Sequence, residues 1–311
     1  MMLRLACAGS LPAMGDPLRY PFSHIEFWLK KQLGLQYSIV GTGEPGWRNR
    51  HGMVERFTQD MEGVEIKLKG AWAKSYCSGR IKPALRPGGA REVAENKYLA
   101  SIVPGGVLKK AAITDPVTIG IELIANSPML VRTYPEIFED VTDALRPVVG
   151  AVSDYVDIVQ FDCPSHVARP IREPWRYVNE LSKTIRKRTW IHIDGDVARV
   201  LPALIKEYDV DVLNVNLFGR EEEANFKAIA ESRRMVQDEG KKLAPAVVNT
   251  QISDEIEEVE SIESIYSRMG RLSRHLSLDT LEAVTPGCGL RLLQNTAQTI
   301  LERLPAAVQK V

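Results

Sequence analysis

The sequence contains few cysteines, and their spacing argues against two kinds of scaffold. Only four occur in 311 residues, at Cys7, Cys77, Cys163 and Cys288, and no two form a close C-x-x-C pair. A disulfide framework or a zinc knuckle would need cysteines paired at short, regular spacing. We therefore expect a cytoplasmic protein whose thiols stay reduced.

The chain also lacks a net charge and a long apolar run. Its 40 lysines and arginines balance 40 aspartates and glutamates, so no excess charge favours nucleic acid or an anionic membrane surface. The apolar run near the first residues is too short for a signal peptide, and no later run reaches the length of a membrane span. Neither nucleic acid nor a membrane is an expected partner.

What the sequence does contain is an alternation of apolar, strand-like runs with amphipathic helical patterns. Strands covered by helices on both faces read as continuous apolar runs, and such alternation favours a parallel sheet. The candidate strands cover residues 3–8, 64–70, 116–123, 156–162, 189–194, 211–216, 246–250 and 282–285. Their number predicts a single (β/α)8 TIM barrel over residues 1–311, with an open doubly wound sheet as the alternative.

Some segments depart from a simple alternation. The glycine-rich segment 34–60 is expected to form an excursion or a hairpin after the first unit. Apolar residues three or four positions apart predict helices over 135–147 and over 253–269, the second capped by Ser253. Pro202 lies within the helical pattern of 197–207, so that helix starts late or is kinked.

Polar side chains gather where the predicted strands end. His192 and Asp194 in "WIHIDGD" are two residues apart, so on an extended chain both point to one face. Asp162 and Asn216 end neighbouring strands, and Cys288 follows the last one. Because a parallel barrel brings all these ends to one mouth, an imidazole, a carboxylate and a thiol can ligate a zinc-like ion there. The alternative is a histidine paired with an aspartate beside an inert thiol.

Five stretches carry a resemblance to a known family. They are "AGSLP" (8–12), "WAKSYCSGRIKP" (72–83), "DPVTI" (115–119), "VQFDCP" (159–164) and "VTPGCGLR" (284–291). In this order, and over nearly the whole chain, they resemble the catalytic carboxyl-terminal barrel of the cobalamin-independent methionine synthase family. The resemblance implies a single-barrel, divergent member, with a barrel of the methionine synthase and uroporphyrinogen decarboxylase type.

The resemblance implies methyl transfer to a thiol held on zinc, as in a homocysteine S-methyltransferase of methionine biosynthesis. The family's metal positions fall on His192, Asp194, Asn216 and Cys288. His192 and Cys288 match the family, whereas Asp194 replaces a cysteine and Asn216 replaces a glutamate. An aspartate can still ligate zinc through oxygen, and an uncharged asparagine is a weaker ligand. His192, Asp194 and Cys288 are thus the expected catalytic residues, with zinc as the expected cofactor.

The resemblance also implies a site for the amino-acid part of a homocysteine-like substrate. The family positions fall on Gly9, Ser10, Glu44 and Asp162. Gly9 and Ser10 could instead form a helix cap, and Glu44 could be a surface residue.

The methyl donor is expected to differ from that of two-barrel members. Those members carry a histidine thought to protonate the departing folate nitrogen, and here the matching stretch "NTQIS" offers Asn249 and Gln251. Neither amide supplies a proton near neutral pH, whereas Co(I) of a corrinoid departs without one. A methyl-corrinoid protein is therefore the favoured donor partner and methyl-folate the other, with His166 as the remaining candidate acid.

Two further interpretations stay open. One is a metal-free lyase or decarboxylase that uses His192 and Asp194 as an acid–base pair. The other is a non-catalytic paralogue that binds a corrinoid protein.

Overall fold

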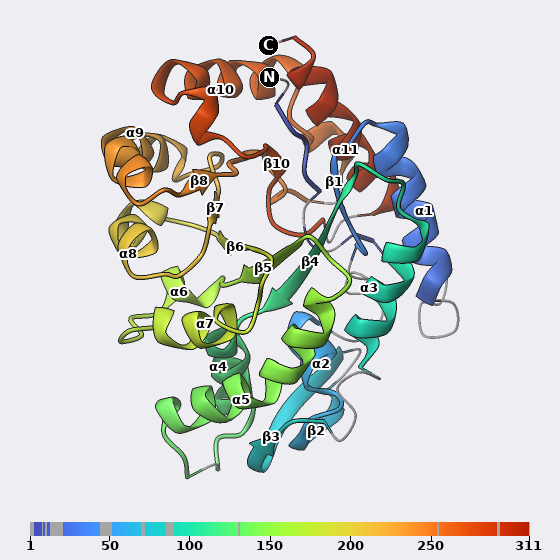
Figure 1. Ribbon diagram of the computed structural model, residues 1–311, viewed down its shortest axis with the longest axis vertical. Helices are drawn as coiled ribbons and strands as arrows, with labels where there is room; N and C mark the ends of the chain where they lie inside the picture. The colour runs from blue at the N-terminus through green and yellow to red at the C-terminus, as the bar shows by residue number, and fades with distance from the viewer. Residues whose placement is uncertain are drawn as a thin grey trace.

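A computed structural model describes residues 3–7, 9, 11–12, 21–43, 52–69, 72–84, 90–129, 131–253, 255–290 and 293–310. The fold is mixed α/β, with a curled, half-barrel sheet of six parallel strands in the order β1-β4-β5-β6-β7-β8 (Figure 1). These strands are β1 (Ile39–Gly41), β4 (Leu108–Thr114), β5 (Ile158–Asp162), β6 (Arg188–Ile193), β7 (Val212–Val215) and β8 (Lys242–Leu243).

Four further strands form two separate pairs. β9 (Ala246–Val248) and β10 (Thr285–Pro286) form a parallel pair, and β2 (Glu62–Lys69) and β3 (Trp72–Lys82) form an antiparallel hairpin. Single parallel bridges join neighbouring segments: Leu5 to Val284, Ala6 to Ile39, Asn216 to Ala246 and Leu243 to Leu281.

Helices pack around the sheet (Figure 1). They are α1 (Pro21–Gly34), α2 (Met53–Thr58), α3 (Arg91–Ile102), α4 (Pro116–Asn126), α5 (Tyr134–Ser153), α6 (Ser165–Ala168), α7 (Trp175–Ser182), α8 (Leu201–Lys206), α9 (Glu222–Asp238), α10 (Ile262–His275) and α11 (Gln294–Val308). Short 3₁₀ turns cover Val197–Arg199, Ile256–Glu258 and Leu278–Thr280. Within the described part of the chain, no helix combines the length and apolarity needed to cross a bilayer.

The strands enclose a small apolar layer on the concave side of the sheet. Its members are Ala6, Ile39, Leu108, Ile158, Trp190, Val212, Ala244 and Ala283, all buried except the partly buried Leu108. A second and larger cluster contains helix residues such as Leu145 and Leu301 together with Ile191 of β6. The sheet is therefore buried on both faces, which accounts for the largely apolar composition of β5 to β7.

The prediction that residues 116–123 and 64–70 form strands of the parallel sheet was wrong. Residues 116–123 are helical because the Asp115 carboxylate accepts hydrogen bonds from the N–H groups of Val117 and Thr118. Pro116 is in the first turn, where its missing N–H costs nothing. Residues 64–70 belong largely to β2, which pairs only with β3 and is largely exposed.

The predicted helix over 253–269 begins later than expected. A 3₁₀ turn covers Ile256–Glu258, and α10 starts at Ile262 with the Ser261 hydroxyl, rather than Ser253, capping the N–H of Ser264. The helix over 135–147 is confirmed within α5, and α8 starts late, with Pro202 in its first turn.

An antiparallel hairpin lies at Glu62–Lys82, just after the segment 34–60 where an excursion or a hairpin was expected. Segment 34–60 instead supplies the sheet strand β1 and helix α2, while residues 44–51 fall outside the described residues. The hairpin packs against α4 and α5 at one end of the molecule (Figure 1).

Candidate metal centre

Three side chains predicted from the sequence meet at the carboxyl end of the sheet. His192 is in β6, Asp194 follows it, and Cys288 follows β10. One ligand atom of each lies within 4.8 Å of the others, and His192 Nε2 is 3.2 Å from an Asp194 carboxylate oxygen. Residues 96 positions apart, 288 − 192 in the sequence, thus reach one point because parallel strands end at one edge.

Asn214 of β7 fixes the orientation of the His192 ring. His192 Nδ1 contacts the Asn214 amide oxygen, which can only accept, so Nδ1 carries the hydrogen. The Asn214 Nδ2 group in turn donates to the carbonyl of Ala244 and, at 3.0 Å, to the Thr285 hydroxyl. The other ring nitrogen, Nε2, is buried and has no well-aligned hydrogen bond among the described residues. It lies 3.2 Å from an Asp194 carboxylate oxygen.

The protonation states of His192, Asp194 and Cys288 depend on one another. Burial by itself would lower the pKa of His192, but negative charge on Asp194 and Cys288 raises it well above its usual range. Burial opposes ionisation of Asp194, yet His192, Cys288 and Asn216 together lower its pKa to about 2. Burial raises the pKa of the Cys288 thiol. The site thus favours a positive charge between the three side chains, supplied either by a proton or by a cation.

The residues present fit a zinc-like ion. Imidazole nitrogen, carboxylate oxygen and thiolate sulfur are all zinc ligands, and three protein ligands leave a fourth position open, as in catalytic zinc sites. The buried Nε2 atom without an aligned partner is the group that a cation would satisfy. The bond from Nδ1 to Asn214 is the kind of outer contact that orients a ligating histidine.

The backbone around Cys288 is held tightly. The Thr250 hydroxyl donates to the carbonyl of Cys288 at 2.8 Å, and the N–H of Gly287 donates to the carbonyl of Val248 at 2.9 Å. A Cβ on Gly287 would lie 2.5 Å from both the Phe218 ring and the Thr250 hydroxyl. Only glycine allows this close approach, so the sulfur position depends on position 287.

Asn216 contacts the triad through Asp194. Its Nδ2 group donates to an Asp194 carboxylate oxygen at 2.5 Å, and its own amide oxygen is buried without a hydrogen bond among the described residues. Asn216 therefore positions the carboxylate in this structure, and its role as a ligand stays a prediction.

Asp162 lies beside the triad, where the sequence placed it. Strands β5 and β6 align Asp162 with His192, and the Gln160 amide donates to the Asp162 carboxylate at 2.7 Å. The buried Lys110 ammonium donates to the same Gln160 side chain. Burial raises the pKa of Asp162 against the opposing effect of His192.

Of the other predicted substrate residues, only Gly9 is described. A Cβ at Gly9 would lie 3.3 Å from an Asp162 carboxylate oxygen, so the Gly9 backbone adjoins this carboxylate. Ser10 and Glu44 lie outside the described residues.

Residues considered for proton donation to a methyl donor have other contacts. Asn249 accepts from the N–H of Gln251, and Gln251 is exposed. His166 is buried between Asp115 and Tyr208, at 2.8 and 2.5 Å, rather than projecting into the triad.

Sequence reasoning missed Asn214, Gln160 and Thr250. Asn214 left a signal, since "LNVN" places two asparagines on one face of an otherwise apolar strand. Gln160 occupies the same kind of position in "VQFD". Nothing in the sequence marks Thr250, because its contact to Cys288 depends on the packing of two loops.

Comparisons with known proteins show similarity to methionine synthases and to a methyltransferase. No family model matches the chain. It is 25% identical over 283 residues to a methionine synthase of Methanocaldococcus jannaschii, covering 86% of this chain and 82% of that protein.

Two solved structures have a similar fold. A B12-independent methionine synthase from a Shewanella species, in complex with selenomethionine, superposes with a TM-score of 0.76 at 16% identity, covering 100% of this chain and 98% of the other. A methyltransferase from Methanosarcina mazei gives a TM-score of 0.66 at 14% identity, covering 99% and 94%. The resemblance to the methionine synthase family is thereby confirmed, and the findings fit a divergent member.

Proposed function

We propose that this protein is a methyltransferase that moves a methyl group to or from a small, homocysteine-like thiol at a zinc centre formed by His192, Asp194 and Cys288. The observation that carries the proposal is the convergence of these three ligand atoms within 4.8 Å. The relatives support the class of reaction, since they include methionine synthases and a methyltransferase.

The proposal includes a closed (β/α)8 barrel. The apolar layer draws one residue from each of eight strand segments, from Ala6 round to Ala283. Hydrogen bonds continue past both edges of the six-stranded sheet: Cys7 N–H donates to the Ile39 carbonyl at the β1 edge, and Glu282 N–H donates to the Leu243 carbonyl at the β8 edge. Ala6 N–H then donates to the Val284 carbonyl and joins the two added segments. These contacts support a closed ring in which residues 3–7 lie between β1 and β10. We propose that residues 1–311 form this barrel as a single domain.

The residues of the chain would divide the work as follows. A bound zinc-like ion would favour the thiolate form of the substrate, which is the nucleophilic form. Asn214 keeps His192 in one orientation, Asn216 orients the Asp194 carboxylate, and Thr250 with Gly287 sets the position of the Cys288 sulfur. We place Asn216 beside the ion as a weak fourth contact at most.

The substrate amine is assigned to Asp162. This buried carboxylate lies next to the triad and beside the Gly9 backbone. A substrate ammonium would neutralise its charge, which burial otherwise disfavours. Ser10 and Glu44 are proposed to complete this subsite. The selenomethionine complex of the Shewanella enzyme, an analogue of a methylated product, supports an amino-acid substrate.

A methyl-corrinoid protein is the proposed donor. Asn249 and Gln251 are amides, and neither can protonate a departing amine. In transfer from a corrinoid, the substrate sulfur attacks the methyl carbon, the Co–C bond breaks, and cobalt keeps the electron pair as Co(I). No acid is required for that step.

An assay of methyl transfer distinguishes the proposed methyltransferase from a metal-free acid–base enzyme. Zinc-loaded protein should demethylate methylcobalamin in the presence of homocysteine under anaerobic conditions, giving methionine and Co(I). The rate should fall at least about 100-fold in Cys288→Ala, and 5-methyltetrahydrofolate should be a poorer donor. Failure with both donors, in protein that binds zinc, would contradict the proposal. Thiol-independent activity that survives chelation would favour the acid–base pair, for which the 3.2 Å contact of His192 and Asp194 is suited.

A further inference from the structure

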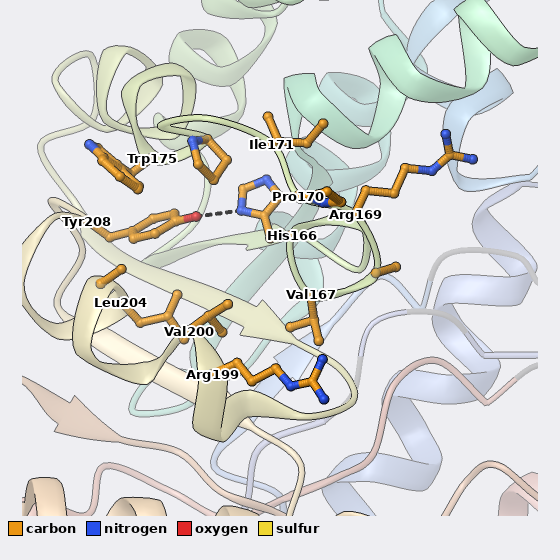
Figure 2. A pocket seen from close by; sticks show the side chains of 13 residues that line it. His166, Val167, Arg169, Pro170, Ile171, Trp175, Arg199, Val200, Leu204 and Tyr208 are labelled. Carbon is orange, nitrogen blue, oxygen red and sulfur yellow. Dashed lines mark hydrogen bonds between the residues drawn. The ribbon is translucent and has the colours of Figure 1, made fainter.

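A pocket of about 500 Å³ lies beside the proposed centre, between the segment that follows β5 and helix α8 (Figure 2). The residues that line it include His166, Val167, Arg169, Trp175, Leu204 and Tyr208. The volume is in the range of small-molecule sites. Val167 lies within van der Waals distance, 3.6 Å, of a Cβ built on Gly195, the residue after Asp194. The pocket thus adjoins the segment that carries Asp194, and none of the three proposed ligands lines it.

The walls of the pocket are apolar and aromatic. Trp175 and Tyr208 approach edge to face, with ring centroids 6.3 Å apart, and they lie together on one side of the pocket (Figure 2). Ile171, Val200 and Leu204 add aliphatic surface. A flat, apolar body would bury its faces against these groups.

The polar residues beside these walls already satisfy one another. His166 contacts Tyr208 through Nδ1 and Asp115 through Nε2, so both ring nitrogens are engaged. Asp115 also caps α4. Although Asp115, Cys163 and His166 lie close enough for an ion, the histidine has no free lone pair to offer. An apolar guest can therefore enter without leaving a buried polar group unpaired.

Two arginine side chains are among the residues that line the pocket. Arg169 and Arg199 both line the pocket, and in Figure 2 their guanidinium groups lie away from Trp175. Arg199 pairs with Asp196 at 2.8 Å. The Arg169 guanidinium has no hydrogen bond or ion pair to any residue that the structure describes. An arginine at the rim of an apolar pocket is suited to an anionic group.

We propose that this pocket binds a small molecule with a planar apolar body and one anionic group, the body against Trp175, Tyr208 and Leu204 and the anion at Arg169. This is a site separate from the triad, and it stands whether or not the triad transfers methyl groups.

Calorimetric titration with 2-naphthoate tests the proposal, with the uncharged 2-naphthamide as the matched ligand. We expect saturable 1:1 binding of naphthoate and at least about fivefold weaker binding of the amide. Arg169→Gln should weaken naphthoate binding at least about fivefold. Arg172→Gln is the control, because Arg172 is exposed on the same segment and does not line the pocket. Val200→Trp should fill the pocket and abolish binding.

Three results would each overturn the proposal: no saturable binding of naphthoate, equal affinity for the amide, or an equal loss in the Arg169 and Arg172 variants. Both arginines are on the surface, so these variants are expected to fold, and the comparison holds even if Val200→Trp does not. The zinc content of the same samples is also measured. An unchanged zinc content in the Arg169 variant would show that weaker naphthoate binding does not arise from loss of metal at the triad.

Discussion

Replacing Asn214 by alanine should weaken zinc binding without any change to a ligand. Asn214 is 3% exposed and makes three hydrogen bonds, to His192 Nδ1, to the Ala244 carbonyl and to the Thr285 hydroxyl. At about 0.5–1.5 kcal/mol each, their loss should lower the free energy of unfolding by about 2–4 kcal/mol. Loss of the bond that orients a ligating histidine should reduce zinc affinity by about 10–100-fold, which is about 1.4–2.8 kcal/mol.

Two measurements on the same protein separate these effects. Zinc affinity is measured by competition with a chromophoric chelator, and stability by urea unfolding. Asn96→Ala is the matched control, because Asn96 is also buried at 3% exposure, donates to the Glu92 carbonyl and lies on α3. The control should lose stability and keep its zinc affinity. A folded Asn214→Ala protein that binds zinc within twofold of the parent would refute the reasoning.

Three further predictions concern position 287, a buried ion pair and pH. Gly287→Ala should cost about 1–3 kcal/mol and displace Cys288, because a Cβ there would meet Phe218 at 2.5 Å; unchanged stability and zinc affinity would count against this account of the loop. Arg268→Met should destabilise by about 3–5 kcal/mol in thermal unfolding, because the buried Arg268 pairs with two carboxylates at 2.9 and 2.7 Å; a neutral effect would show that the network adds little. Burial raises the pKa of Glu92 from 4.5 to about 7, so the folded state holds this proton more tightly than the unfolded state and stability falls as pH rises through that range. As the pH rises through that range, Glu92→Gln should therefore gain stability relative to the parent, by up to about 1.4 kcal/mol per pKa unit. A stability difference between the two proteins that does not change with pH would contradict this.

The sequence predicts those parts of the fold whose local pattern and tertiary environment agree. Strands β5 to β7 are largely apolar because both faces of the sheet are covered. Strand β4 was not predicted because it begins "LKKAA", and the buried Lys110 is accommodated by contacts with other strands, among them Gln160 and the Trp190 ring. The run 116–123 is rich in β-branched residues, yet Asp115 and Pro116 start a helix there. A terminal cap outweighed strand propensity.

The candidate site was likewise predictable from the sequence only in part. His192, Asp194 and Cys288 lie at recognisable strand ends and resemble family positions, so their proximity was predictable, and one ligand atom of each lies within 4.8 Å of the others. Their roles in binding and catalysis stay predictions. The residues that orient them, Asn214 and Thr250, act through contacts across strands and loops that no local pattern encodes.

Metal analysis of the purified protein tests the central claim most directly. After exposure to excess zinc and removal of loosely held ions, elemental analysis should give about one zinc per chain in the parent and near none in Cys288→Ala. The matched variant Cys77→Ala should keep its zinc, because Cys77 is buried in the β2–β3 hairpin and belongs to no candidate metal cluster among the described residues. A parent protein that retains no zinc, or a Cys288→Ala protein that retains as much as the parent, would contradict the assignment of His192, Asp194 and Cys288 as a metal centre.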